Sequence, residues 1–228
     1  MYDCEKFRLG NPADGGYVVM ETDGYDCFLS AGLGANVTFE KDFIKRYNVP
    51  AFAFDGDEKT KDEVALALDG TGIDFIPQFI TVQDTPNSMS WSKYFKEYNN
   101  MFVKMDIEGY DITSGEWPLL ASWTHQDLNK IRQLVIELHF PSTALHWQLL
   151  EKLTQTHYMI HFHANNNNNT IYRIDKMHIP AVFECTYIRK DLLDNPKYNT
   201  VSLPTALDCP NIKGKMDYSF NCPPWVRN

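Results

Sequence analysis

The sequence is poor in cysteine, and its cysteines are not arranged to bind zinc or to pair. The five among 228 residues are Cys4, Cys27, Cys185, Cys209 and Cys222. Their number is odd and no two follow the spacing C-x-x-C, so neither a disulfide framework nor a zinc knuckle is indicated. We expect reduced thiols, with Cys27 and Cys185, which lie in apolar runs, buried in the core.

Long apolar runs and an excess of basic residues are also missing. No segment approaches the roughly 18 apolar residues of a membrane span, and the N-terminus lacks the apolar stretch of a signal peptide. The chain has 21 Lys+Arg against 30 Asp+Glu, a net charge of −9. Such a chain does not attract nucleic-acid phosphates or anionic lipid at long range. We therefore expect a soluble, cytoplasmic protein without a membrane span and without a nucleic-acid partner.

The length and composition suit one domain. With 43% hydrophobic residues, 228 residues suffice to bury a full core. We expect a single domain over residues 1–228, with an N-terminal segment (1–25) and a core (26–190). Residues 191–228 are rich in Pro and Asn and are expected to form an irregular tail.

Apolar, strand-like runs alternate with helix-like segments along the core. The predicted strands are 26–30, 51–54, 75–80, 101–105, 131–138, 158–163 and 181–188, and the predicted helices are 37–47, 60–68, 91–98 and 142–155. This alternation predicts an α/β fold, a doubly wound Rossmann-like sheet of seven strands covered by helices on both faces. Because no long helix separates the last two strands, we expect them to form an antiparallel C-terminal hairpin. In such a sheet, ligands bind at the carboxyl ends of the strands, near the point where the strand order reverses.

Glycines and acids follow the first two strands of the core. Gly32 and Gly34 lie between a strand and a helix, where glycine lets the backbone approach a ligand closely. Asp55, in the turn Asp55-Gly56-Asp57, follows Gly34 by 21 residues. An acid about 20 residues after a glycine turn holds the ribose hydroxyls in dinucleotide folds, so Asp55 is a candidate for that role.

Two acids follow the fourth strand. If that strand continues through Glu108, its two-residue period places Asp106 and Glu108 on the same side, at the open end of the sheet. Paired acids there are costly unless a cation is near. A metal, a sulfonium cofactor or a basic substrate group would supply that cation.

Histidines end the fifth and sixth strands. His139, in Glu137-Leu138-His139, is the best candidate for a general base because the pKa of histidine lies near neutrality. His161 and His163 are weaker candidates. The run Asn167–Asn169 is expected to be a polar, flexible loop.

Four segments together resemble the FkbM-type family of S-adenosylmethionine-dependent methyltransferases. They are Asp14-Gly15-Gly16-Tyr17-Val18-Val19, Ser30-Ala31-Gly32-Leu33-Gly34, Lys104-Met105-Asp106-Ile107-Glu108-Gly109 and Ile136-Glu137-Leu138-His139. Later segments, His163–Asn166, Glu184–Tyr187 and Leu207–Asn211, resemble the eukaryotic and viral branch of that family. The K-x-D-x-E-G segment is the most specific, and the likeness covers nearly the whole chain.

The resemblance implies a class I methyltransferase sheet and transfer of a methyl group from S-adenosylmethionine to oxygen, commonly a sugar hydroxyl of a glycan or glycosylated small molecule. Site roles carry over by position. Gly32 and Gly34 line the methionine end of the cofactor, Asp55 in its turn with Gly56 holds the ribose, and Asp84 contacts adenine.

Asp106 would then face both the sulfonium and the acceptor. Family members usually open the first loop with Asp or Glu, whereas Ser30 stands here. The resemblance therefore implies that Asp106 or Glu40 holds the amino group of the cofactor.

For the chemical step we expect direct in-line transfer, in which the protein chiefly orients the acceptor oxygen toward the methyl carbon. Because a sugar hydroxyl is a poor nucleophile, His139 or a carboxylate of Asp106 or Glu108 removes its proton. Alternatively, Mg²⁺ or Mn²⁺ held by Asp106, Glu137 and His139 lowers the pKa of that hydroxyl.

Other functions remain open at this level. Asp55-Gly56-Asp57 also fits the D-x-D pattern of a metal-dependent glycosyltransferase, although the nucleotide-binding unit before it is short. An NAD-dependent dehydrogenase is disfavoured because Val37 stands at the third glycine of G-x-G-x-x-G. A non-catalytic nucleotide-binding module would leave the acids at three strand ends unexplained.

Overall fold

Seven strands form the central sheet of the computed structural model, which describes residues 1–174 and 177–227. Across the sheet they are β6 (Ile73–Ile76), β5 (Ala51–Phe54), β4 (Cys27–Ala31), β9 (Met101–Met105), β10 (Ile131–His139), β14 (Val182–Arg189) and β11 (His157–Ala164). Neighbours from β6 to β10 pair in parallel, and β14 is antiparallel to both β10 and β11. Numbered along the chain, this order is 3-2-1-4-5-7-6 with an antiparallel seventh strand. The predicted fold class, a Rossmann-like class I methyltransferase sheet, is confirmed.

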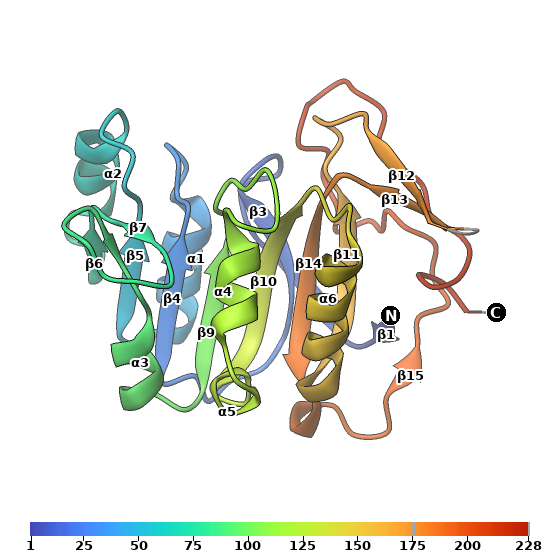
Figure 1. Cartoon of the computed structure of the whole chain (residues 1–228), viewed down its shortest axis with the longest axis horizontal. Helices are drawn as coiled ribbons and strands as arrows, with labels where there is room; N and C mark the ends of the chain where they lie inside the picture. The colour runs from blue at the N-terminus through green and yellow to red at the C-terminus, as the bar shows by residue number, and fades with distance from the viewer. Residues whose placement is uncertain (175–176, 228) are drawn as a thin grey trace.

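Helices cover both faces of this sheet (Figure 1). On one face lie α3 (Ser92–Glu97), α4 (Glu116–Ser122), α5 (His125–Leu128) and α6 (Ala144–Thr156), and their buried side chains share one apolar cluster with the sheet. On the other lie α1 (Thr38–Tyr47), α2 (Lys61–Leu68) and the hairpin β2 (Lys6–Gly10)–β3 (Gly16–Met20), which pack in a second cluster. The alternating pattern of the sequence therefore predicted the layers correctly.

The third predicted strand was placed too late in the chain. We expected residues 75–80, whereas β6 spans Ile73–Ile76. Pro77 cannot donate a hydrogen bond to a neighbouring strand, so the ladder ends before it. Phe79–Ile80 instead forms a short strand, β7, which pairs with β8 (Ser88–Met89).

The last two sheet strands are antiparallel as predicted, but they are not joined by a simple hairpin. The strands β12 (Ile171–Ile174) and β13 (Met177–Pro180) lie between them in the sequence and form a separate two-stranded sheet. The chain then returns as β14 between β10 and β11. This insertion of β14 separates β11 from the parallel part of the sheet.

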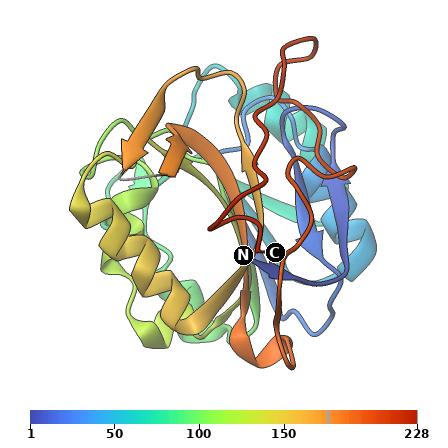
Figure 2. The ribbon, with the colours of Figure 1, turned by 90° about the vertical axis from the view of Figure 1, so that its right-hand side faces the viewer.

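The tail from residue 191 is mostly irregular and crosses the β11 edge of the sheet (Figure 2). Its strand β15 (Lys197–Tyr198) pairs with β1 (Tyr2–Asp3), and Trp225 stacks on Phe162 of β11. All five cysteines are free, and Cys27 and Cys185 are buried as expected. Along residues 1–174 and 177–227, no helix has the length and apolar character needed to cross a membrane.

Candidate functional site

A cavity of about 690 Å³ opens at the carboxyl ends of β4, β5 and β9. This is where the strand order reverses, since β5 and β6 lie on one side of β4 while β9 and β10 lie on the other. Its walls come from the glycine loop after β4, the turn after β5, the segment Phe79–Thr81 and the loop after β9. Asp14 and Gly15, from the turn between β2 and β3, complete the lining.

The two glycines of the loop after β4 differ in what they require. Both have positive φ, +74° at Gly32 and +53° at Gly34. A Cβ on Gly32 would lie 1.6 Å from the backbone oxygen of Asp106, whereas a Cβ on Gly34 would meet no atom within 4 Å. Gly32 therefore lets the loop pack directly against the end of β9.

Asp55 fixes this loop from the neighbouring strand end. Its Oδ2 accepts hydrogen bonds from the backbone N–H groups of Leu33 and Gly34, both at 2.9 Å. Its Oδ1 accepts from the N–H of Asp57, also at 2.9 Å. The predicted ribose residue thus lines the cavity, beside the glycine loop.

Phe79 forms the wall next to Asp55 and packs against Gly56. A Cβ on Gly56 would lie 2.4 Å from the Phe79 ring, so only glycine lets the ring rest against this turn. Phe79 itself lines the cavity and is 52% exposed, an unusual state for an apolar ring. Gly56 contributes to the site through Phe79 rather than as part of the cavity lining.

Asp84, the predicted adenine contact, does not line this cavity. It is exposed, and its Oδ1 accepts a hydrogen bond of 2.6 Å from the backbone N–H of Ser90. This bond holds the pKa of Asp84 below its usual value. A contact between Asp84 and adenine stays a prediction, while Phe79, Ile80 and Thr81 occupy that side of the cavity.

Asp106 lies at the centre of a buried polar network. Its Oδ2 accepts a hydrogen bond from the hydroxyl of Tyr17, on β3. Burial by itself would raise the pKa of Asp106, but the positive charge of Lys104 and hydrogen bonds from Glu137 and Tyr17 hold it below its usual value. Asp106 is therefore an ionised carboxylate at neutral pH.

Glu137, one strand further, is the neutral partner of Asp106. Burial and the adjacent charge of Asp106 raise the pKa of Glu137 well above its usual value. Asn165 donates a hydrogen bond of 2.6 Å to its Oε1. Glu137 therefore keeps its proton at neutral pH beside the ionised Asp106, as long as no metal ion or cationic ligand is bound there.

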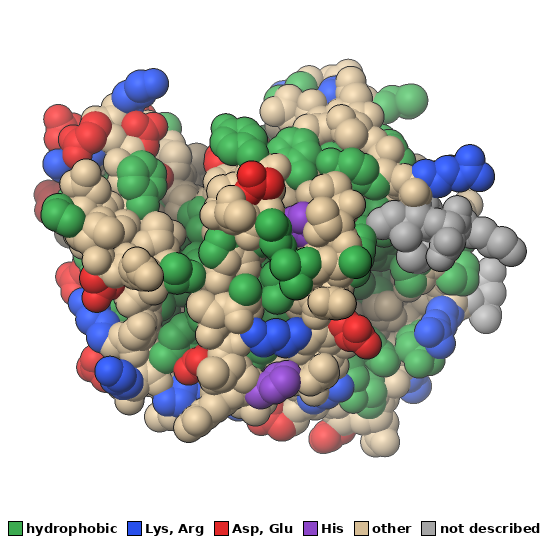
Figure 3. Space-filling model, viewed as in Figure 1, with side chains coloured by type: hydrophobic (Ala, Val, Ile, Leu, Met, Phe, Trp, Pro, Cys, Tyr) green, Lys and Arg blue, Asp and Glu red, His purple; other side chains and the backbone are tan. Residues whose placement is uncertain are grey.

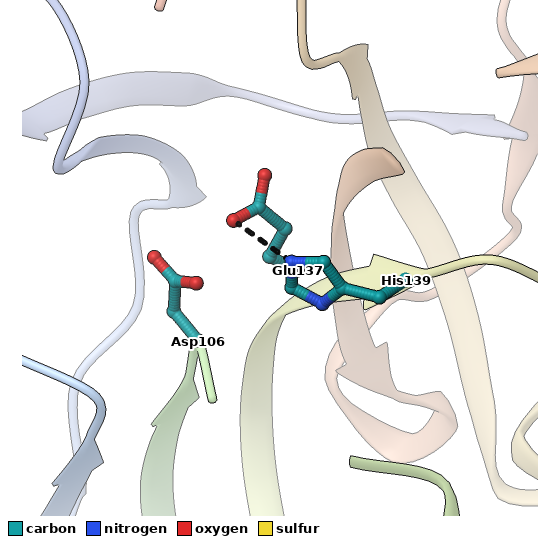
Figure 4. Close-up of side chains that lie close together, drawn as sticks. All are labelled: Asp106, Glu137 and His139. Carbon is teal, nitrogen blue, oxygen red and sulfur yellow. Dashed lines mark ion pairs between the residues drawn. The ribbon is translucent and has the colours of Figure 1, made fainter. Parts of the chain in front are cut away.

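His139 ends β10 next to these acids, and Figure 4 shows Asp106, Glu137 and His139 converging. Its Nε2 lies 3.4 Å from Glu108 Oε2 and 3.8 Å from Glu137 Oε2, while its Nδ1 lies 3.4 Å from Glu116 Oε2. Burial lowers the pKa of His139, but the carboxylates of Glu116, Glu108 and Asp106 outweigh it and raise the pKa above its usual value. Glu116 is fully buried in α4 and also accepts a hydrogen bond from the backbone N–H of His139.

Glu108 lies differently from the strand prediction. The strand β9 ends at Met105, so Glu108 belongs to the following loop and does not share a strand face with Asp106. Its side chain is 74% exposed and reaches His139 from the outside. The sequence therefore predicted correctly that Glu108 lies near the site, but it was wrong in placing Glu108 on the same strand as Asp106.

Glu40 is unavailable to a cofactor. It is fully buried, and its Oε1 accepts a 2.6 Å hydrogen bond from Ser30 Oγ and lies 3.7 Å from Lys104 Nζ. Lys104 in turn donates a 2.6 Å hydrogen bond to the carbonyl of Gly32. Of the two alternatives for the amino group, Asp106 lines the cavity and the fully buried Glu40 does not, so the geometry favours Asp106.

His161 and His163 face away from the cavity, toward the tail. His161 Nε2 lies 2.7 Å from Asp208, and His163 lies 3.3 Å from Glu184 and 2.9 Å from Asp217. Burial lowers the pKa of His163, but the carboxylates of Asp217 and Glu184 raise it to about 10. These histidines attach the tail to the sheet.

Sequence reasoning missed Tyr17, Phe79, Lys104 and Glu116 as site residues. Tyr17 and Lys104 lie in the segments that carry the family resemblance, which was the available signal for them. Glu116 begins a helix that the strand and helix pattern did not predict. Three of the predicted residues, Asp106, Glu137 and His139, do converge, with one ligand atom of each within 4.8 Å of the others.

Comparisons with known proteins add weak likenesses. No protein-family model and no curated protein sequence matches the chain. An rRNA methylase from Streptococcus thermophilus is 11% identical over 73% of this chain and 89% of its own, with a TM-score of 0.42. TrmK from M. capricolum, in complex with S-adenosyl-homocysteine, is 10% identical over 74% and 64%, with a TM-score of 0.41. Precorrin-6y C5,15-methyltransferase from Geobacter metallireducens is 9% identical over 75% and 82%, with a TM-score of 0.41. The strand order of the sheet, rather than these likenesses, defines the fold.

Proposed function

We propose that the chain is an S-adenosylmethionine-dependent methyltransferase. The observation that carries this proposal is one cavity, at the reversal point of the sheet, that combines a glycine loop, the carboxylate of Asp55 and the ionised Asp106. Asp55 suits a ribose, since a carboxylate accepts hydrogen bonds from both of its hydroxyls. Asp106 suits the positive sulfonium, and the exposed ring of Phe79 offers a surface on which adenine can stack.

The geometry of Asp55 also favours this function over a glycosyltransferase. In a D-x-D motif both carboxylates turn toward one metal. Here both oxygens of Asp55 accept hydrogen bonds from backbone N–H groups, and Asp57 Oδ1 accepts from the N–H of Lys59 at 2.9 Å. Asp55 is thus tied to the glycine loop after β4 and Asp57 to its own turn, so the two carboxylates serve different segments, and Oδ1 of Asp55 keeps a second lone pair for a ribose hydroxyl.

The acceptor side of the proposal rests on His139. Neutral His139 takes the proton of the acceptor hydroxyl at Nε2 while Glu116, behind Nδ1, stabilises the imidazolium that forms. Asp106 orients the reacting groups and is itself held by Tyr17. Glu108, at the outer edge, stabilises the protonated imidazole from the other side.

Mg²⁺ or Mn²⁺ is a second means of activating the acceptor. The donor set of Asp106, Glu137 and His139 fits such an ion, because its ligand atoms lie within 4.8 Å of one another and Glu116 and Asn165 support two of the ligands from behind. When bound, the ion would lower the pKa of a coordinated hydroxyl. Glu137 must lose its proton before it can bind a cation, so binding of Mn²⁺ should release a proton. Calorimetry in two buffers with different ionisation enthalpies would detect this release.

We further propose that the acceptor atom is oxygen, on a sugar hydroxyl of a glycan or glycosylated small molecule. This finer statement follows from the resemblance of the Lys104–Gly109 and Ile136–His139 segments to the FkbM-type family. A histidine base beside the methyl site is consistent with it, since a hydroxyl needs deprotonation on transfer.

Titration calorimetry with S-adenosylhomocysteine, a UDP-sugar and NAD tests the proposal, each with and without Mn²⁺. We expect micromolar binding of S-adenosylhomocysteine and no comparable binding of the UDP-sugar or NAD. Asp55→Ala should weaken binding of S-adenosylhomocysteine roughly tenfold or more, because two charge-assisted hydrogen bonds are lost. The control Glu58→Ala, at a neighbouring acid outside the cavity lining, should leave it within about twofold. Micromolar binding of the nucleotide sugar, with none of S-adenosylhomocysteine, would overturn the proposal.

A second experiment tests Asp106 without an acceptor. Asp106→Asn removes a charge beside the sulfonium, so binding of S-adenosylmethionine should weaken about tenfold more than binding of uncharged S-adenosylhomocysteine. Asp84→Asn is the matched control, because Asp84 lies outside the cavity lining. Equal losses for both ligands in Asp106→Asn would contradict the assignment of Asp106 to the sulfonium.

A further inference from the structure

A second, smaller hollow adjoins the cofactor cavity on the far side of His139. It has a volume of about 180 Å³ and shares Glu108 with the larger cavity. Glu137 and His139 form its floor, and Tyr110, Asn167 and Asn168 are among its walls. A hollow of this size, below the roughly 300 to 1,000 Å³ of drug-sized ligands, takes a single ring with its substituents.

The residues that line the hollow offer little attraction to an anionic group. Among the described residues that line it, two are acids, Glu108 and Glu137, and none is Lys or Arg. Figure 3 shows hydrophobic side chains gathered over this part of the face, around one acidic side chain and without basic ones among them. Nucleic acids and phosphorylated ligands gain affinity from Lys and Arg, so this surface does not suit them.

Tyr110 presents an aromatic ring at the rim. It is 76% exposed, which leaves one face free for a ligand. Its backbone N–H donates a 2.9 Å hydrogen bond to Ser114 Oγ, and Asp111 Oδ1 accepts from Thr113 N at 2.8 Å, so the loop that carries the ring is tied to itself. An exposed tyrosine on such a loop can bind an apolar ring face at low entropic cost, because its side chain has few rotatable bonds.

The asparagine run forms another part of the lining, and hydrogen bonds hold its backbone. Asn165 Oδ1 accepts from the N–H of Asn167 at 2.9 Å, and Asn168 Oδ1 accepts from the N–H of Thr170 at 2.8 Å. Tyr218 of the tail donates a 2.9 Å hydrogen bond to the carbonyl of Asn168. Within the described part of the chain no hydrogen bond engages the side-chain amide of Asn167, which leaves its donor and acceptor for a ligand.

We propose that this hollow binds the methyl acceptor, and that the acceptor is an uncharged, hydroxyl-bearing ring that stacks on Tyr110 and hydrogen-bonds to Asn167. The proposal rests on the proposed function, because it places one acceptor hydroxyl at His139 Nε2 beside the cofactor cavity. It assigns specificity to Tyr110, in the loop that carries Glu108, and to Asn167, in a run that the sequence predicted to be only a polar, flexible loop. Lys215 lies next to this wall, but its Nζ is bonded at 3.1 Å to the carbonyl of Asn167, and the described residues of the lining include acids and no Lys or Arg, so we expect a phosphorylated ring or an RNA strand to bind more weakly than a neutral ring.

Saturation-transfer NMR tests this on the whole chain loaded with S-adenosylhomocysteine. The probes are methyl glycosides of common hexoses, the matching sugar 6-phosphates and a short single-stranded RNA. We expect saturation transfer to the ring protons of at least one neutral glycoside and weaker binding of its phosphate. Tyr110→Ala should weaken that glycoside roughly tenfold, and Asn167→Ala severalfold, with binding of S-adenosylhomocysteine unchanged. Tyr198→Ala, at an exposed tyrosine on β15, is the matched control and should change neither.

The outcomes separate this proposal from the proposed function. If S-adenosylhomocysteine binds but no neutral glycoside does, or if RNA or the phosphates bind best, the acceptor proposal is wrong while the cofactor assignment stands. Undiminished glycoside binding in both Tyr110→Ala and Asn167→Ala also overturns it. If S-adenosylhomocysteine itself does not bind, the proposed function is wrong, and the acceptor proposal that rests on it is wrong as well.

Discussion

Substituting Gly32 by alanine tests how the glycine loop is built. The change places a Cβ 1.6 Å from the Asp106 carbonyl oxygen, at a φ of +74°. The left-handed conformation costs an alanine about 1–2 kcal/mol. A contact this short cannot be absorbed by side-chain motion, because the obstructing atom is backbone, and such overpacking typically adds about 1–3 kcal/mol. We therefore expect Gly32→Ala to lower the free energy of unfolding by about 2–5 kcal/mol.

Gly34→Ala provides the matched control two residues away. Gly34 also has a positive φ, +53°, but a Cβ at this position would meet no atom within 4 Å. Only the conformational cost of about 1–2 kcal/mol then applies. The two variants share the substitution, the loop and the sign of φ, so the difference between them isolates the contact with the end of β9.

Urea unfolding followed by circular dichroism measures both values, and calorimetry with S-adenosylhomocysteine reports the cavity. Because Lys104 bonds to the carbonyl of Gly32, displacement of the loop in Gly32→Ala should also disturb the surroundings of Asp106 and abolish measurable binding. Gly34→Ala should bind, more weakly than the wild type. Equal destabilisation by the two substitutions, or a greater effect at Gly34, would refute the close approach between the loop and β9.

Three further predictions concern residues behind the site. Tyr17→Phe removes the hydroxyl that donates to Asp106 and should lower the free energy of unfolding by about 1 kcal/mol; an unchanged urea midpoint would argue against that bond. In metal-free buffer, NMR titration of His139 should give a midpoint above the ordinary value of 6.5, since nearby carboxylates raise its pKa, and Glu116→Gln should lower that midpoint; a wild-type midpoint below 6.5 would contradict this. For His163, whose pKa is raised from 6.5 to about 10, the stabilisation is complete below the unfolded value and is lost as pH rises through about 10. The difference in unfolding free energy between wild type and His163→Gln should therefore shrink from about pH 6 to about pH 10, and a constant difference would count against the ion pairs.

Local patterns predicted those parts of the site that depend only on where strands end. Gly32, Asp55, Asp106 and His139 each follow or close an apolar run, and parallel strands bring their carboxyl ends to one edge, so their convergence was foreseeable. Tyr17 lies 89 residues from Asp106, and no local signal states that a hairpin outside the sheet will reach the centre of the cavity. Contacts of this kind depend on tertiary packing.

The misplaced histidines show the same limit in topology. His161 and His163 alternate along a strand as predicted and do share one face of β11. Had β11 paired directly with β10, they would have continued the row of strand ends beside His139. Because β14 inserts between β10 and β11, that face meets the tail instead, and the histidines pair with its acids. A sequence pattern gives the face of a strand but not its neighbour.

Under the proposed function, the charges around Asp106 would favour the cofactor over its product. Lys104 Nζ lies 3.7 Å from Glu40 Oε1, and its charge helps to outweigh burial and lower the pKa of Asp106, while burial and the charge of Asp106 raise the pKa of Glu137. A residual negative charge is costly in a buried site, and a sulfonium offsets it. Methyl transfer converts that sulfonium to a neutral thioether, so the electrostatic attraction disappears when the reaction is complete. Under the proposed function, the site would therefore bind S-adenosylmethionine more tightly than S-adenosylhomocysteine, and this difference should depend on the carboxylate of Asp106.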